Sequence, residues 1–122
     1  MGEEGTQGVG VHRLIATWAV TASGTGGTVS ATRAAKASRR HYVTTMSGTA
    51  STGTTIPRVE LVVNGVVVYQ GHASVGRTAL VDSATFYLSL PIPFRVMPGK
   101  SVTLRITGHT GTGFVSMMGY TE

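Results

Sequence analysis

The stretch that decides the fold is Arg58-Val59-Glu60-Leu61-Val62-Val63-Asn64-Gly65-Val66-Val67-Val68-Tyr69-Gln70, which Gly71 closes. It places β-branched runs on both sides of an Asn-Gly pair. Both residues of that pair can adopt a positive φ, which a two-residue type I′ hairpin turn requires. The stretch therefore predicts two antiparallel strands joined by a tight turn.

Short Thr- and Val-rich runs separated by glycine continue in both directions from this hairpin. They predict further strands over residues 14–21, 28–33, 39–46, 84–90, 91–96, 101–107 and 114–120, with a short piece at Leu80-Val81. Turn signals at intervals of about 8–12 residues are typical of an antiparallel sandwich or barrel. We expect an all-β fold, an antiparallel β-sandwich of eight or nine strands, with a jelly roll as the first choice.

Several connections are also predicted. Ser23-Gly24-Thr25-Gly26-Gly27 and residues 108–113 are expected to be turns between strands, and residues 47–57 an exposed loop. Met97-Pro98-Gly99-Lys100 fits a type II turn, with proline and glycine at its central positions. Pro91 and Pro93 indicate an edge or a bend, because proline cannot donate a hydrogen bond to a strand ladder.

The strand at residues 101–107 has the clearest alternation. Val102, Leu104 and Ile106 are expected to point inward, and the intervening Thr103, Arg105 and Thr107 outward. Trp18 lies in another alternating run, where we expect it to be part of the core.

The length of 122 residues fits a single domain. Residues 1–10 contain four glycines and no periodic apolar pattern, so we expect a flexible arm over residues 1–11 and one domain over residues 12–122. No apolar run approaches the roughly 20 residues of a membrane span, and we expect no membrane partner.

The composition is poor in charge. Charged residues make up 12% of the chain, against about 25% in ordinary soluble domains. Such a deficit indicates either that Thr, Ser and Gly cover the exposed faces or that part of the surface is buried against other copies of the chain or against a partner. The net charge of +5 favours anionic partners, and the absence of cysteine excludes disulfides and thiol chemistry.

The inventory of reactive side chains is thin, and we expect no enzyme, no metal and no cofactor. Outside the terminal segments the acids are Glu60, expected on the solvent side of its strand, and Asp82, expected in a turn. The histidines, His12, His41, His72 and His109, lack the short spacings of metal ligands. The glycine-rich stretches neither open a helix nor contain the lysine of a P-loop.

One local concentration of positive charge stands out. It comprises Arg33, Lys36, Arg39 and Arg40, followed by His41 and Tyr42. A single flanking aromatic residue is fewer than a stacking platform for single-stranded nucleic acid needs. We therefore expect the four basic residues to bind an acidic protein partner rather than nucleic acid.

Residues 16–35, Arg40-His41-Tyr42-Val43-Thr44 and the ending Gly119-Tyr120-Thr121 resemble parts of small virion proteins of tailed bacteriophages. The resemblance covers about half of the chain. The cement or decoration proteins of phage heads are similar proteins, compact β folds that assemble as trimers on the capsid lattice. The resemblance carries over no functional residue.

The resemblance implies a protein made in the host cytoplasm that binds the outer surface of a capsid, as a homotrimer in contact with the major capsid protein, and stabilises the shell. The N-terminal arm and the stretch from Arg33 to Arg40 are the expected contacts. The alternative is a receptor- or carbohydrate-binding module of a tail fibre or adhesin, using residues 47–57 and 108–113 to contact its ligand.

Overall fold

The structure is a computed structural model that describes residues 15–51, 56–77 and 82–122. Every regular element in these residues is a β-strand, which confirms the all-β prediction. The strands are β1 (Ala16–Arg33), β2 (His41–Ser51), β3 (Arg58–Val63), β4 (Val66–His72), β5 (Ser74–Arg77), β6 (Asp82–Val96) and β7 (Val102–Thr121). All of their pairings are antiparallel.

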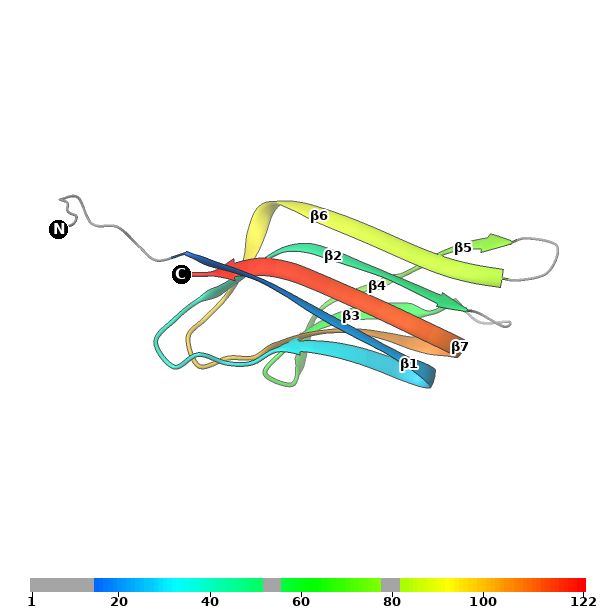
Figure 1. Cartoon of the computed structure of the whole chain (residues 1–122), viewed down its shortest axis with the longest axis horizontal. Helices are drawn as coiled ribbons and strands as arrows, with labels where there is room; N and C mark the ends of the chain where they lie inside the picture. The colour runs from blue at the N-terminus through cyan, green and yellow to red at the C-terminus, as the bar shows by residue number, and fades with distance from the viewer. Residues whose placement is uncertain (1–14, 52–55, 78–81) are drawn as a thin grey trace.

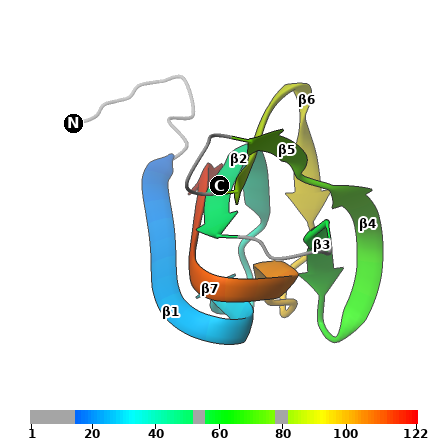
Figure 2. The same cartoon turned by 90° about the vertical axis from the view of Figure 1, so that its right-hand side faces the viewer.

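The strands form one sheet in the order β4-β3-β7-β2-β6-β5, with β1 added beside β7. Strands β1 and β7 make a long ribbon that doubles back on itself, so that the sheet curls into two facing halves (Figures 1 and 2). In the first, here called the β3 half, residues 28–33 of β1 and 102–107 of β7 continue to β3 and β4. In the second, the β2 half, residues 16–25 of β1 and 112–121 of β7 continue to β2, β6 and β5.

The prediction of eight or nine strands is not confirmed, because the described residues hold seven. The expected turns at residues 23–27 and 108–113 are sharp folds within β1 and β7, where the two strands stay paired. Gly26 and Gly27 have φ of 73° and 66°, and the register shifts beside them. Glycine reaches such φ values without steric cost, so the ribbon folds over without losing its ladder.

Strand β6 likewise unites two predicted strands. Its ladder with β2 passes from Phe94 opposite Val43 to Ser89 opposite Thr45, so residues 90–93 form a bulge. Pro91 and Pro93 lie in this bulge, as the predicted bend requires. The expected loop at residues 47–57 is partly wrong, since residues 47–51 belong to β2, and residues 52–55 lie outside the described residues, as do Leu80 and Val81.

The two local turn predictions are confirmed. Asn64 and Gly65 have φ of 50° and 86°, and they join Val63 to Val66 as a type I′ turn does. Gly99 has φ of 78°, and the N–H of Lys100 donates to the carbonyl of Met97 over 3.2 Å. Residues 34–40 connect β1 to β2 without forming a strand or helix.

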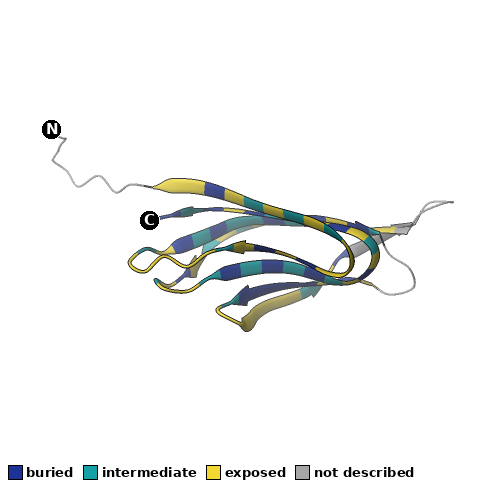
Figure 3. Ribbon diagram, turned by 60° about the horizontal axis from the view of Figure 1, so that its bottom comes forward, coloured by how far each residue is buried: buried dark blue, intermediate teal, exposed yellow. Residues whose placement is uncertain are grey.

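The core fills the space between the two halves, and buried residues alternate with more exposed ones along most of β2 and β7 (Figure 3). Val102, Leu104 and Ile106 are fully buried from the β3 half, as predicted, and Val115 and Met117 are fully buried from the β2 half. Trp18 is also buried, which confirms its assignment to the core. Because β7 supplies both layers, its apolar residues hold the two halves together.

Candidate binding surfaces

The predicted basic residues lie at the end of β1 and in the connection to β2. This connection is fixed at both of its sides. The N–H of Gly99 donates to the carbonyl of Lys36 over 2.8 Å, and the backbones of Arg40 and Glu122 exchange hydrogen bonds of 3.1 and 2.9 Å. Lys36 and Arg40 are exposed, Arg39 is half-buried, and Lys100 is exposed beside Gly99.

Lys100 therefore joins this basic end of the molecule, although sequence reasoning missed it. The turn that carries it was predicted, but its contact with Lys36 joins segments more than sixty residues apart. Arg33 differs from the other predicted residues because it points toward the core. Its guanidinium carbon lies 5.4 Å from the centroid of the Trp18 ring, a cation–π arrangement.

His41 is buried next to this cluster, edge-on to Trp18 at 5.9 Å between ring centroids. Its Nε2 lies 2.7 Å from the carbonyl oxygen of Ala34, and its Nδ1 lies 2.6 Å from Thr121 Oγ1. Since a carbonyl can only accept, Nε2–H donates to Ala34 and the Thr121 hydroxyl donates to Nδ1. Burial lowers the pKa of His41, and the nearby positive charges of Arg33 and Lys36 lower it further against the opposing effect of the Ala34 bond. His41 is thus a neutral structural residue.

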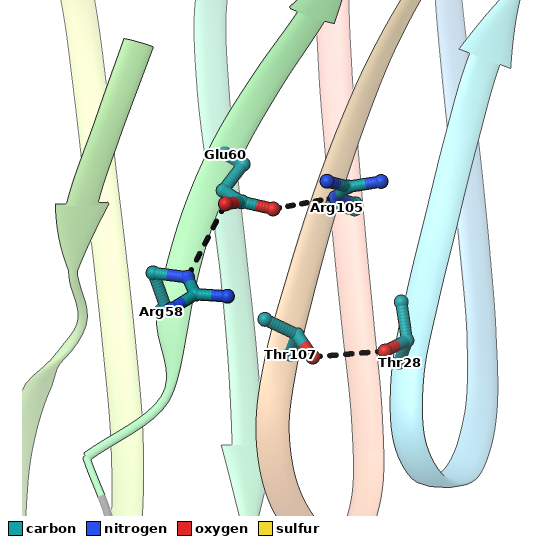
Figure 4. Close-up of polar contacts among 5 residues, drawn as sticks. All are labelled: Thr28, Arg58, Glu60, Arg105 and Thr107. Atoms are coloured by element: carbon teal, nitrogen blue, oxygen red, sulfur yellow. Dashed lines mark hydrogen bonds and ion pairs between the residues drawn. The ribbon is translucent and has the colours of Figure 1, made fainter. Parts of the chain in front are cut away.

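The outer face of the β3 half is polar and internally paired (Figure 4). Arg105 Nε donates to Glu60 Oε1 over 2.6 Å, and Arg58 Nε lies 3.2 Å from Glu60 Oε2. The hydroxyls of Thr28 and Thr107 share a hydrogen bond of 2.9 Å. Each of these five side chains therefore has a partner on its own or the next strand.

The expectation that Glu60 faces solvent is wrong, since only 5% of the residue is exposed. Glu60 does lie on the outer face, but the two arginines cover it. Arg105 is opposite Glu60 on β7 and 45 residues away in sequence, so local pattern carries no sign of the pairing.

The outer face of the β2 half has a different chemistry. Its residues alternate with buried neighbours along four adjacent strands, and we call this set the uncharged face. It comprises Thr17, Ala19, Thr21 and Ser23 of β1, Phe114, Ser116, Met118 and Tyr120 of β7, Tyr42, Thr45, Ser47 and Thr49 of β2, and Thr85, Tyr87 and Ser89 of β6. None of these fifteen residues is an acid, lysine or arginine, and the exposed Arg95 of β6, opposite Tyr42, lies at the edge of the face.

Large apolar groups stand out from this face among small hydroxyl residues. Tyr42 and Tyr120 stack with their ring centroids 4.8 Å apart and an interplanar angle of 13°. Tyr87 is 71% exposed, and Phe114 and Met118 are also exposed. Exposed apolar groups gathered on one face mark an interaction surface more often than scattered ones do.

Close strand approach beneath the uncharged face depends on Gly119. It lies opposite Trp18 on β1 and Val43 on β2. A Cβ atom at Gly119 would collide with the carbonyl oxygen of Tyr42 and approach the Trp18 ring to 2.7 Å. A side chain at position 119 is therefore excluded, because the strand backbone of Tyr42 cannot move away from it.

The two halves are open to each other between β4, at one end of the sheet, and the part of β6 beyond its pairing with β5. A cleft of about 190 Å³ lies here, lined by Met46, Val59, Tyr69, Gly71, His72, Phe86, Tyr87 and Leu88. Strand β4 pairs only with β3 among the described strands. Its residues Val66, Val67, Val68 and Tyr69 are all exposed. The lining of the cleft is thus uncharged and includes aromatic rings and one imidazole.

The described parts of the segments expected to contact a ligand in the alternative function lie largely in strands. Residues 108–113 belong to β7, and residues 47–51 belong to β2. His109 is buried against Gly113, and its ring nitrogens have no hydrogen-bond partner among the described residues.

Within residues 15–51, 56–77 and 82–122, no three His, Cys, Asp or Glu residues are placed to hold a metal ion. No helix in that part of the chain is long and apolar enough to cross a membrane. Comparisons with protein-family models, curated proteins and solved structures found no match to this chain.

Proposed function

We propose that this protein is a non-catalytic structural component of a tailed-phage virion, a cement or decoration protein that binds the outside of the capsid and stabilises it. The observation that carries the proposal is the uncharged face. It spans four strands, carries a formal charge only at its edge, where Arg95 lies opposite Tyr42, and exposes Tyr87, Phe114 and Met118 to solvent. A stable subunit with such a face gains free energy when a partner covers it.

The basic end supplies a second contact. Lys36, Arg40 and Lys100 are exposed where the β1–β2 connection meets the turn before β7. Positive charge there steers the protein toward an acidic shell made of the major capsid protein and speeds association, while the uncharged face provides the apolar burial. In this proposal Arg33 orders the region through Trp18 instead of touching the partner.

We also propose that the curled sheet is a jelly-roll-like sandwich and that the protein acts as a homotrimer. The folded β1–β7 ribbon supports the first idea, because folding a long antiparallel ribbon over itself produces the two layers of such a sandwich. The shortage of charge supports the second, since oligomer contacts bury surface that a monomer would expose.

The test is a heat challenge of purified capsids with and without added protein. Wild-type protein should raise the temperature at which the capsids release their DNA, and Met118→Glu should lose most of that effect without unfolding. Thr103→Glu, which places the same charge on the outer face of the β3 half, is the matched control and should behave like wild type. Equal protection by wild type and Met118→Glu would contradict the assignment of the contact face.

The arm has its own test within this proposal. Deleting residues 1–11 should abolish attachment to capsids and leave the circular dichroism spectrum unchanged. Full occupancy of the shell by the shortened protein would reject a role for the arm.

A receptor- or carbohydrate-binding module is the second candidate. Tyr69 and Tyr87 line the open cleft, and exposed aromatic rings are suited to stacking against sugar rings. Reproducible binding on a glycan array, lost on Tyr87→Ala, would favour this function over capsid binding.

A further inference from the structure

Positive charge gathers at the end of the sheet where β2 begins and β7 ends. The cations there are Lys36, Arg39 and Arg40 of the β1–β2 connection, Arg95 near the end of β6, and Lys100 of the turn before β7. Glu122, whose backbone pairs with that of Arg40, is an acid at the same end. Among the described residues the cations outnumber it, so this end attracts anions.

Two tyrosine rings stand beside this charge on the outer face of the β2 half. Tyr42 of β2 lies opposite Tyr120 of β7, and the rings stack with their centroids 4.8 Å apart and their planes 13° from parallel. Neighbouring strands are themselves about 4.8 Å apart, so each ring stands upright over its own strand. The sequence places Tyr42 next to the basic residues, and the pairing of β2 with β7 supplies the second ring.

The stack of two rings is open on the side of β1. The residue of β1 opposite Tyr120 is Thr17, which is small and exposed. A shallow groove of about 420 Å³ begins there, lined by Thr17, Trp18, Ala19, Thr44, Met118 and Gly119. The face of the Tyr120 ring that turns away from Tyr42 therefore borders an uncharged groove. A planar group placed above Thr17 would become the third member of the stack.

Arg40 and Arg95 flank the Tyr42 ring on its other sides. Arg40 lies two residues before Tyr42 and continues the ladder by pairing with Glu122, so it lies on the same face as the ring. Arg95 is opposite Tyr42, which makes Arg40 and Arg95 diagonal neighbours about 7–8 Å apart. Two guanidinium groups at this spacing can bind one phosphate group together or two successive ones.

We propose that this end of the molecule binds single-stranded nucleic acid, with a base stacked on Tyr120 above Thr17 and phosphate groups at Arg40 and Arg95. Positive charge alone fits any polyanion, but an open ring face beside it fits one that carries planar groups. A single strand offers a base at every nucleotide, whereas an acidic protein would leave the face of Tyr120 uncovered. This inference goes beyond the proposed function, and a copy attached to a capsid through the uncharged face would not hold the strand at the same time.

Fluorescence anisotropy with a labelled oligothymidylate of about ten nucleotides, a length within the usual site size, tests the proposal. Wild-type protein should bind the oligonucleotide, and added salt should weaken binding because phosphate contacts release counterions. Tyr120→Ala should lower the affinity about tenfold, since it removes the ring under the base. Tyr120→Phe keeps that ring and should bind like wild type.

A second variant changes an exposed residue and so spares the fold. Thr17→Glu puts a carboxylate where the base would lie, and it should lower the affinity about tenfold as well. Thr21→Glu is the matched control, because it adds the same charge to an exposed position on the same face of β1, and it should bind nearly as tightly as wild type. Arg95→Gln should reduce the slope of log affinity against log salt concentration by about 0.7, the value for one phosphate contact on a single strand.

Failure of wild type to bind at low salt, or wild-type affinity in Thr17→Glu or in folded Tyr120→Ala, would overturn the inference. Equal affinity for the corresponding duplex would also overturn it, because the bases of a duplex are stacked inside and cannot reach Tyr120. Equal competition by polyglutamate of the same length would show that this end binds acidic proteins instead. Protection of capsids is a separate measurement, so the proposed function and this inference can fail independently.

Discussion

The two outer faces of the curled sheet lie on the same ribbon but have opposite characters. On the β3 half, Arg58 and Arg105 both pair with the carboxylate of Glu60, and the threonines pair across strands. On the β2 half, the corresponding positions carry Ser, Thr and Ala with exposed Tyr, Phe and Met. The first face satisfies its own polar groups, while the second leaves apolar surface for a partner.

This contrast shows where a chain with few charges concentrates them. Ion pairs on a sheet face keep that face hydrated and unsuitable for apolar contact. The outer face of the β2 half has none of these ion pairs and bears its charge only at the edge, at Arg95, so it is the surface that can be buried.

The largest effect should come from Gly119→Ala, which breaks the sheet beneath the uncharged face. The new methyl group collides with backbone at Tyr42, and overpacking of this kind costs about 3 kcal/mol. Thermal unfolding should show a melting temperature lower by many degrees. Gly24→Ala is the control, since its Cβ would make an ordinary contact of 3.6 Å with Val29, and an equal loss there would refute the steric explanation.

Glu60→Ala should weaken the β3 half without reaching the β2 half. It leaves Arg58 and Arg105 without their carboxylate, but both arginines are partly exposed and can be hydrated, so the expected loss is about 2 kcal/mol. Urea unfolding measures it. Ser116→Ala on the uncharged face should change stability by less than about 0.5 kcal/mol, and similar losses in both variants would erase the contrast.

The Thr28–Thr107 pair should contribute less. A double-mutant cycle with Thr28→Ala and Thr107→Ala should give a coupling energy of about 0.5 kcal/mol, as cross-strand hydroxyl pairs do. A coupling energy indistinguishable from zero would mean that each hydroxyl bonds to water as favourably as to the other hydroxyl.

The weakest expected effect is a gradual change of stability with pH that depends on His41, the first residue of β2. Because the pKa of His41 is lowered in the folded protein, the unfolded chain binds its proton more readily. Its contribution to stability is therefore complete above the unfolded pKa of 6.5 and is lost as the pH falls through the lower folded pKa. Unfolding at a series of pH values should show this decline, and it should persist in His72→Gln, an exposed control. A flat profile below pH 6.5 would contradict burial of the neutral ring.

Local sequence was sufficient wherever structure depends on neighbouring residues. Asn64-Gly65 and Pro98-Gly99 specify their turns through backbone preferences, and the alternation around Leu104 follows from one buried face. The glycine-rich stretches misled the strand count for a physical reason. Glycine permits both a loop and a folded ribbon, and only the distant partner strand decides between them.

The surfaces were harder to predict for the same reason. The charge deficit indicated a buried face, but strand pairing between segments far apart determined which residues formed it. The stretch Arg33 to Arg40 was dense in sequence, yet the fold turns Arg33 toward Trp18 and brings in Lys100 from another connection. Burial of Glu60 required Arg105, whose position opposite it depends on the pairing of β3 with β7.

The β1–β7 ribbon also has a consequence for biosynthesis. Ala16 pairs with Thr121 and Arg33 with Val102, so the first strand to leave the ribosome has to wait for the last before it can be completed. During that interval an uncharged segment, residues 16–32, is available to wrong partners, and such non-local pairing slows folding. High-level expression should therefore produce inclusion bodies. A circularly permuted gene that encodes β1 and β7 consecutively should reduce the fraction of the protein found in them.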